Sequence, residues 1–305
     1  MINGVVVINK SSGLTSHQEV QRLRKLLPDV KAGHTGTLDP MATGVLPVCL
    51  GKATRLVEYI VEQPKCYRAA ISFGTVTDTG DADGEVLEKN QVPLLDRNVL
   101  EKTVDSFTGV REQLPPLYSA VKYKGKPLYR WAREGSVVPR KGRLVEIYGI
   151  EIISFQAVSE PQLVLDITCS KGTYIRTLAV DLGQSVGCGA HLSALQRLSV
   201  GPYTLQEALT TADFARLVEE NDYSAKIYPP DSAVEHLPRI ELDALQTERL
   251  RQGREVLLNR EDCPEEDSSV PVIRIYDQEK QFRALAKITS EDSGCRLKTI
   301  KFLFY

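Results

Sequence analysis

A twelve-residue run near the N-terminus restricts what this chain can fold into more than any other feature: residues 33–44 read Gly-His-Thr-Gly-Thr-Leu-Asp-Pro-Met-Ala-Thr-Gly. Gly36 and Gly44 permit backbone angles that other residues avoid, while Pro40 fixes its own φ angle and biases Asp39 toward extended geometry. The run therefore predicts a rigid loop that aims one carboxylate. Leu-Asp-Pro also occurs in turns in which the aspartate caps its own backbone, so the interpretation of Asp39 depends on the rest of the sequence.

The chain has 305 residues, which is enough for a large core and predicts one large and one small domain. No apolar run approaches the roughly 18 residues of a membrane span, and the first residues lack the basic front of a signal peptide. We therefore expect a soluble, cytoplasmic protein with no membrane partner. The formal net charge of −2 argues against general affinity for nucleic acid, so any contact with phosphates has to come from local patches.

Six cysteines are scattered through the sequence without paired spacing, which predicts reduced thiols and not a disulfide framework. Cys188 and His191 have the Cys-x-x-His spacing of a zinc site, but no further ligands stand near them. We therefore expect no metal.

A basic segment over about 115–143 is the clearest local patch. Between Pro115 and Val145 eight basic residues stand against one acidic residue, Glu134, a net charge of +7. Aromatic residues are interleaved with these charges, a pattern that suits contact with phosphates and unstacked bases, although a solvated basic face is the alternative. The basic residues are Lys122, Lys124, Lys126, Arg130, Arg133, Arg140, Lys141 and Arg143.

Strands and helices alternate through the first three quarters of the chain. Ser16 with Glu19 has the pattern of a capping box that opens a helix, which Pro28 stops after about Leu27. Further helices are expected over 53–62, 98–107 and 173–186, and strands over 4–9, 45–50, 66–73, 144–155, 162–169 and 192–200. Neighbouring strands mostly pair with each other, so we predict an α+β domain on a largely antiparallel sheet with flanking helices.

A domain boundary is expected near the Tyr-Pro-Pro-Asp sequence at 228–231. We therefore assign residues 1–232 to a large domain that carries the basic segment as an insertion, and residues 233–305 to a small β-rich domain. In the small domain the pattern predicts a helix over 242–252 and strands over 270–276, 282–288 and 298–304.

Four further motifs accompany the Asp39 loop: Asn-Lys-Ser-Ser-Gly-Leu-Thr-Ser at 9–16, Lys-Cys-Tyr at 65–67, Lys-Gly-Thr-Tyr-Ile-Arg-Thr-Leu-Ala-x-Asp-Leu-Gly at 171–183 and His-Leu-Ser-Ala-Leu-x-Arg at 191–197. In this order and spacing the set resembles that of the bacterial tRNA pseudouridine synthases of the TruB family. The resemblance extends over about residues 1–203. By position as much as by pattern, the C-terminal residues resemble the PUA-type RNA-binding domain of the same proteins.

The resemblance implies isomerisation of uridine 55, in the T-arm loop of tRNA, to pseudouridine without a cofactor or metal. It also implies a pseudouridine-synthase-like fold. The reaction breaks the N1–C1′ bond, turns the uracil, joins C5 to C1′ and removes the C5 proton. A carboxylate serves such a path as a nucleophile at C1′ or C6 or as a base on the ribose, and the sequence does not choose among these. Because the target base lies in a folded loop, the enzyme has to flip it out.

The resemblance makes Asp39 the essential carboxylate and Arg176 the partner that keeps it ionised and oriented. Tyr67 is expected to stack on the target base near the departing C5 proton, and Tyr174 to pack or hydrogen-bond at the same pocket. Leu195 is expected to form an apolar wall of that pocket, although as isolated residues the tyrosines and this leucine would fit a core equally well.

Two further residues are assigned to the substrate on the same basis. His34 is expected to stack in the space that the flipped base leaves, and Lys10 to support the catalytic loop or to contact a phosphate. The basic insertion corresponds in position to the segment that these enzymes close over the T-arm. Nothing in the sequence demands an obligate protein partner or more than a monomer.

Three other functions fit parts of the sequence. Asp78-Thr79-Gly80 matches the aspartic-protease triplet but occurs once, and its surroundings read as a solvated turn. A glycosidase-like hydrolase needs a second placed acid, which no motif supplies. A non-catalytic tRNA-binding or folding factor would use the basic insertion and the C-terminal domain while Asp39 shapes a loop. An assay on tRNA separates these possibilities.

Overall fold

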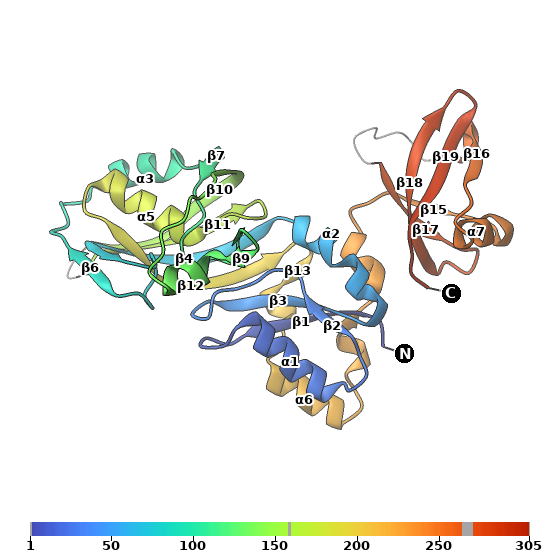
Figure 1. The fold of residues 1–305 in the computed structure, drawn as a ribbon, viewed down its shortest axis with the longest axis horizontal. Helices are drawn as coiled ribbons and strands as arrows, with labels where there is room; N and C mark the ends of the chain where they lie inside the picture. The colour runs from blue at the N-terminus through green and yellow to red at the C-terminus, as the bar shows by residue number, and fades with distance from the viewer. Residues whose placement is uncertain (1, 158–159, 264–270, 305) are drawn as a thin grey trace.

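The structure is a computed structural model that describes residues 2–157, 160–263 and 271–304. The strands of a ten-stranded sheet are spread over residues 4–228, and a five-stranded sheet is formed by the residues that follow. Figure 1 shows the large sheet with α3 (Arg97–Asp105) and α5 (Ile175–Val186) over one half and α1 (Ser16–Leu26) and α6 (Thr211–Glu219) against the other, while the five-stranded sheet forms its own lobe. No helix in the described ranges is long and apolar enough to cross a membrane.

The large sheet has the order β14-β1-β3-β12-β4-β11-β10-β7, with β13 beside β12 and β2 beside β3. All its pairs are antiparallel except β12 with β3, so the prediction of a largely antiparallel sheet is confirmed. The strands are β1 (Gly4–Lys10), β2 (Ala32–His34), β3 (Thr43–Leu50), β4 (Lys65–Phe73), β7 (Gly109–Gln113), β10 (Arg143–Gln156), β11 (Gln162–Cys169), β12 (Ala190–Val200), β13 (Tyr203–Thr204) and β14 (Ile227–Tyr228).

The parallel contact between β12 and β3 joins the two halves of this sheet where the Asp39 loop enters it. Arg197 pairs there with Gly44, whose φ is +100°, and a Cβ on Gly44 would lie 2.3 Å from the Arg197 carbonyl oxygen. Only glycine fits this close approach. The buried Arg197 side chain donates to the carbonyls of Val45 (2.7 Å) and Gly36 (3.2 Å), which ties the start of the loop to the junction.

Helix α1 (Ser16–Leu26) corrects the predicted capping box by one residue. Its N-cap is Thr15, whose side chain accepts from the backbone of Gln18, and the Gln18 side chain accepts from Thr15 in return. Ser16 binds the Asp39 loop instead, because its hydroxyl accepts from Leu38 N (2.8 Å) and donates to Leu38 O (3.3 Å). Thr15 and Ser16 are both good N-caps, so composition alone could not separate them.

The helices predicted over 53–62, 98–107 and 173–186 are present with small shifts. The helix expected over 53–62 is a 3₁₀ turn, η1 (Gly51–Leu56), that continues into α2 (Val57–Glu62). The helices expected over 98–107 and 173–186 are α3 (Arg97–Asp105) and α5 (Ile175–Val186), and α6 (Thr211–Glu219) is a further helix for which no range was predicted. Helices α3 and α5 pack with β4, β10, β11 and β12 in one apolar core, and α1 and α6 pack with β1 and β3 in another.

The C-terminal lobe is β-rich, as predicted. Its sheet has the order β15-β17-β18-β19-β16 and is accompanied by α7 (Ala244–Arg251). Val270, the start of one expected strand, lies outside the described residues. The short strands β15 and β16 were not predicted. The five strands are β15 (Arg239–Glu241), β16 (Val256–Asn259), β17 (Val272–Tyr276), β18 (Phe282–Glu291) and β19 (Gly294–Phe302).

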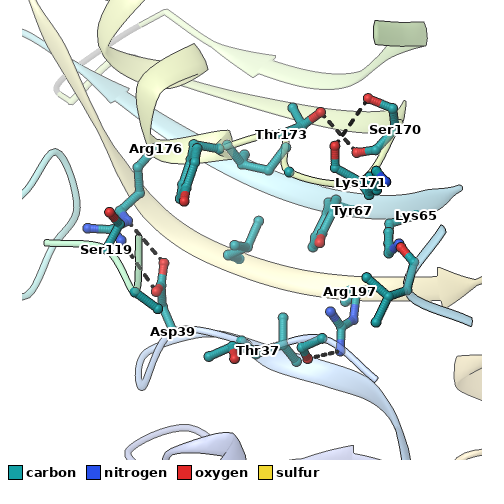
Figure 2. A pocket seen from close by; sticks show the side chains of 18 of the residues that line it. Thr37, Asp39, Lys65, Tyr67, Ser119, Ser170, Lys171, Thr173, Arg176 and Arg197 are labelled. Atoms are coloured by element: carbon teal, nitrogen blue, oxygen red, sulfur yellow. Dashed lines mark hydrogen bonds and ion pairs between the residues drawn. The ribbon is translucent and has the colours of Figure 1, made fainter. Parts of the chain in front are cut away.

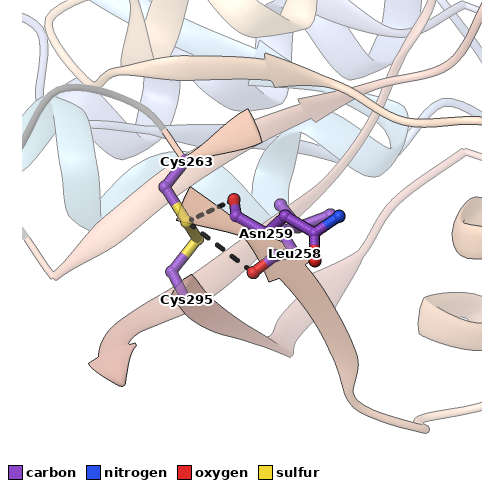
Figure 3. The surroundings of a disulfide bond; sticks show 4 residues. All are labelled: Leu258, Asn259, Cys263 and Cys295. Atoms are coloured by element: carbon purple, nitrogen blue, oxygen red, sulfur yellow. Dashed lines mark hydrogen bonds between the residues drawn. A yellow bond between two sulfur atoms is a disulfide. The ribbon is translucent and has the colours of Figure 1, made fainter. Parts of the chain in front are cut away.

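A disulfide in this lobe corrects the prediction that all cysteines are reduced. Cys263 follows β16 and Cys295 lies on the neighbouring β19, and their Cα atoms are 6.0 Å apart (Figure 3). A separation of 32 residues gives no sequence signal, because the two thiols meet only through strand pairing. The other four cysteines are free thiols.

The two lobes share an apolar core, which fixes the C-terminal sheet against η1 and α2. Leu56 and Ile60 from these helices pack in one cluster with Phe282 and Leu303. Arg55 also donates to the Phe302 carbonyl at 2.7 Å. Helix α2 also contributes Val61 to the cavity described below, so this helix lies between the C-terminal lobe and the cavity.

Candidate active site

A cavity of about 240 Å³ opens between the Asp39 loop, β4, the start of α5 and the root of the basic insertion. Figure 2 shows Asp39, Arg176 and Ser119 at one end, Tyr67 in the middle, and Lys65 with Arg197 at the other end. The lining residues are Thr35, Gly36, Thr37, Leu38, Asp39, Val61, Lys65, Tyr67, Ser119, Ala120, Ser170, Lys171, Gly172, Thr173, Tyr174, Ile175, Arg176, Leu195 and Arg197.

Asp39 and Arg176 form the ion pair that the sequence predicted. Arg176 Nε lies 3.0 Å from Asp39 Oδ2, and Arg176 Nη2 donates to Asp39 Oδ1 at 3.3 Å. This bidentate contact orients the Asp39 carboxylate and also pairs its charge. The Asp39 side chain is 37% exposed at the cavity surface, whereas Arg176 is 5% exposed. The carboxylate is therefore open to a ligand while its partner is held inside the protein.

Arg176 also binds a second carboxylate that sequence reasoning missed. Asp81 is buried, and its Oδ2 lies 3.4 Å from Arg176 Nη1. The Arg176 guanidinium further donates to the carbonyls of Thr79 (3.2 Å) and Tyr118 (2.8 Å). The turn around Asp81 was read as solvated, which is wrong for this residue. No sequence spacing reveals this contact, because only the folded chain brings the turn around Asp81 next to Arg176 on α5.

The pKa of Asp39 lies above its ordinary range. Burial raises this pKa most, the Arg176 guanidinium opposes the shift, and the nearby Asp81 charge raises the pKa further. The predicted pairing is present, but desolvation outweighs the stabilisation that it gives to the charged form. A carboxylate in this position is a stronger base than an exposed aspartate.

Three other predicted residues line the same cavity. Tyr67 projects into it from β4, Tyr174 stands at the start of α5 and Leu195 comes from β12. Burial raises the pKa of the Tyr67 hydroxyl, while a hydrogen bond with Arg197 and its positive charge lower it. The cavity therefore offers an aromatic ring and an apolar wall beside a carboxylate.

Lys65 and Arg197 make the far end of the cavity positive, a feature for which the sequence analysis assigned no role. The buried Lys65 ammonium donates to the carbonyls of Gln63 (2.6 Å) and Val61. Burial and the Arg197 charge lower the pKa of Lys65 to about 8. Their place within the Lys-Cys-Tyr and His-Leu-Ser-Ala-Leu-x-Arg motifs is the only sequence signal that could have marked them.

Lys10 and His34 do not line the cavity. The Lys10 side chain is fully buried, and its ammonium donates to the carbonyls of Leu14 (2.6 Å), Ser11 (2.9 Å) and Pro40 (3.1 Å). It holds the loop beside Asp39 and presents no exposed charge to a phosphate. Burial lowers the pKa of Lys10 to about 8. His34 ends β2, where its Nδ1 accepts from Gly36 N at 3.4 Å, and burial lowers its pKa.

The basic insertion folds as a short hairpin followed by α4 (Leu128–Arg133). Its hairpin pairs β8 (Lys122–Tyr123) with β9 (Lys126–Pro127) and turns through Lys124 at φ +48° and Gly125 at φ +82°. Lys126 is half-buried over the Trp131 ring and pairs with Glu134. The other seven basic residues of the insertion are exposed, as a surface for phosphates requires.

Asp78, the aspartate of the aspartic-protease-like triplet, is outside the cavity lining. Asp81 does not line the cavity either, and Asp78 accepts from Glu85 N and the Tyr118 hydroxyl. Across the described ranges, no three His, Cys, Asp or Glu side chains gather in a way that could hold a metal ion.

Comparison with known proteins identifies the family. A family model described as "TruB family pseudouridylate synthase (N terminal domain)" matches residues 24–175, and one described as "tRNA pseudouridylate synthase B C-terminal domain" matches residues 176–235. A "tRNA pseudouridine synthase B" of Marinomonas sp. (strain MWYL1) is 43% identical over 290 residues, covering 94% of this chain and 92% of that protein. The chain belongs to the TruB family. The match to the Marinomonas protein spans both lobes, the two family models together cover residues 24–235, and both confirm the TruB-family resemblance drawn from the motifs.

Other relatives agree with this membership. A "tRNA pseudouridine synthase B" of Chromohalobacter salexigens is 45% identical over 255 residues, covering 83% of this chain and 81% of that protein. Among solved structures, a chain in the "Crystal Structure of a Cbf5-Nop10-Gar1 Complex" superposes with a TM-score of 0.74 at 26% identity, covering 99% of this chain and 85% of the other. This chain therefore shares its fold with that structure along nearly its whole length.

Proposed function

We propose that this TruB-family protein converts uridine 55 in the T-arm loop of tRNA to pseudouridine. The observation that carries the proposal is the Asp39 carboxylate, held by Arg176 at the surface of a cavity that also contains Tyr67 and Leu195. Related proteins named tRNA pseudouridine synthase B support a tRNA substrate. Since tRNA is processed in the cytoplasm, we place the enzyme there.

In this proposal the target uridine is flipped into the cavity, which repays the unstacking cost with stacking and hydrogen bonds. Tyr67 stacks on the uracil and Leu195 closes its other side. Asp39 acts at the glycosidic region, as a nucleophile or as a base on the ribose, while Arg176 keeps it aimed. Tyr174 packs at the pocket mouth, and His34 fills the space that the base leaves in the RNA loop.

Docking of the T-arm is assigned to the exposed charges of the basic insertion and to the small C-terminal domain. We divide the chain into residues 1–232, the catalytic domain, and 233–305, a PUA-like RNA-binding domain. The insertion supplies phosphate contacts and stacking rings. We further propose that a monomer acts without a cofactor, a metal or an obligate protein partner.

The test is pseudouridine mapping of an unmodified tRNA transcript after incubation with the purified protein and no added metal or nucleotide. We expect a single new pseudouridine at position 55. Tight binding without conversion would favour the non-catalytic tRNA-folding factor instead. Conversion at another position would contradict the assigned site while keeping the reaction.

A further inference from the structure

Gln113, the last residue of β7, makes an unusual contact with the start of α5. Its side chain is 2% exposed. Tyr174 N donates to Gln113 Oε1 at 2.9 Å, and Gln113 Nε2 donates to Tyr174 O at 3.3 Å. One side-chain amide thus binds both main-chain polar groups of a single residue, as a neighbouring strand would. No sequence motif had marked Gln113.

Gln113 holds the Tyr174 N–H from outside α5, whereas the Tyr174 carbonyl also accepts from Leu178 N at 3.2 Å within the helix. Tyr174 is the N-cap of α5, in extended geometry at φ −99° and ψ 108°, but tyrosine has no short acceptor that could cap the helix. The first turn of a helix leaves donors unpaired, so the chain at this point depends on outside partners. Gln113 supplies such a partner for the residue that precedes the first turn.

This contact lies between two functional parts of the molecule. Tyr174 lines the cavity, and Arg176 follows two residues later with its guanidinium on Asp39. On the other side, Gln113 directly precedes the basic insertion, whose Tyr118 carbonyl accepts from Arg176 at 2.8 Å. The root of the insertion and the first turn of α5 are therefore joined by hydrogen bonds at both Tyr174 and Arg176.

We propose that Gln113 is a positioning residue for the isomerisation: its amide holds the Tyr174 backbone so that the Tyr174 ring and the Arg176 guanidinium stay in register with Asp39. This inference rests on the proposed function. It does not require Gln113 to touch the RNA. Reactions that depend on a fixed geometry lose about 10²-fold in rate when groups move by about 1 Å, so removal of the clamp acts on the chemical step.

The experiment compares Gln113→Ala with Gln162→Ala as a matched control. Gln162 also uses its amide on β11, where it donates to the hydroxyls of Ser72 and Ser193, but it does not line the cavity. We expect Gln113→Ala to lower the single-turnover rate by about 10- to 100-fold with the tRNA Kd changed by less than about threefold. Gln162→Ala leaves both values near wild type. An unchanged rate for Gln113→Ala overturns the proposal, as does an equal loss in the control.

A second variant separates positioning from general damage to the fold. Gln113→Glu keeps an acceptor for Tyr174 N but loses the donor to Tyr174 O while it is ionised, and protonation restores that donor. The rate of this variant relative to wild type should therefore rise as the pH falls. A relative rate that is independent of pH contradicts the proposal, even if Gln113→Ala does not fold.

Hydrogen exchange gives a readout without activity. The Tyr174 amide should lose protection in Gln113→Ala while the amides of β4 keep theirs; retained protection at Tyr174 overturns the clamp. If wild-type protein makes no pseudouridine in the same assay, the proposed function fails, whereas this exchange result still decides whether Gln113 fixes Tyr174.

Discussion

The Asp39–Arg176 pair and the basic insertion both rely on charge, but the fold treats their charges in opposite ways. Arg176 is 5% exposed and contacts Asp39, Asp81 and two carbonyls. In the insertion, seven of the eight basic side chains are exposed. Buried charges have lost their water and need fixed partners, whereas exposed ones keep their water until a ligand replaces it.

In the proposed function, this difference separates the region that carries out the chemical step from the region that docks the RNA. A fixed network costs desolvation during folding, but its groups need little rearrangement when charge develops in the cavity. Exposed, hydrated charges do not hold a reacting group in a fixed position, yet they attract a polyanion over some distance. Substitutions in the first region should therefore change rates, and those in the second should change affinity and its salt dependence.

Removal of Arg176 should have the largest effect among the partners of Asp39. We expect Arg176→Lys to lower the single-turnover rate by about 10²- to 10³-fold, because a single ammonium cannot reproduce the bidentate contact with Asp39. The tRNA Kd should change little. A matched control is Arg130→Lys on the exposed insertion, which should keep the rate; equal losses in both variants would erase the contrast between the regions.

Buried Lys10 and exposed Lys122 should also differ in how much each contributes to the stability of the fold. Lys10→Met removes a buried ammonium that donates to the carbonyls of Ser11, Leu14 and Pro40, so we expect the free energy of unfolding to fall by about 3 kcal/mol. Lys122→Met on the exposed hairpin should leave it within about 0.5 kcal/mol of wild type. Chemical denaturation measures both. If Lys10→Met is as stable as wild type, the Asp39 loop does not depend on this ammonium.

Much of the fold could be predicted because its signals are local. Alternating apolar residues marked β10 and β11, and proline marked the end of α1. The same locality explains the errors: Thr15 and Ser16 look alike as caps, and Cys263 and Cys295 meet only through strand pairing.

Some residues of the candidate site could also be predicted from local motifs, whereas others could not. The motifs brought Asp39, Tyr67, Tyr174, Arg176 and Leu195 to one cavity, where the structure places them together. Asp81 and Gln113 escaped notice because each acts through a partner far along the chain, and neither residue type in its local sequence indicates that partner. Their roles follow from burial and hydrogen bonds, which are properties of the folded chain.

On the insertion, charge reversal at Lys122 and Lys124 should weaken tRNA binding by about tenfold and make its salt dependence shallower, by about 0.7 to 0.9 in the log–log slope per lost phosphate contact. Reversal at Lys126 should add less to this loss, because Lys126 already pairs with Glu134. Titrations at several salt concentrations measure both quantities. An unchanged slope would remove the insertion from the docking surface.

The smallest expected effect is a shift in pH dependence. If the reaction needs the Asp39 carboxylate, the rate falls with decreasing pH as this group takes up a proton. Because burial raises the pKa of Asp39, the fall should begin at a higher pH than for an exposed aspartate. The guanidinium opposes that shift, so Arg176→Gln should move the acid limb to still higher pH. Single-turnover rates from about pH 4 to about pH 8 test this, and an acid limb at the same pH in both proteins would contradict the coupling.

The most direct test of the account is Asp39→Asn, assayed for pseudouridine formation and tRNA binding side by side. The amide keeps the size of the side chain but can act neither as nucleophile nor as base. We predict no detectable conversion, a loss of at least about 10³-fold, with a Kd within about threefold of wild type. Pseudouridine formation at a rate near that of wild type would contradict the central role of this carboxylate.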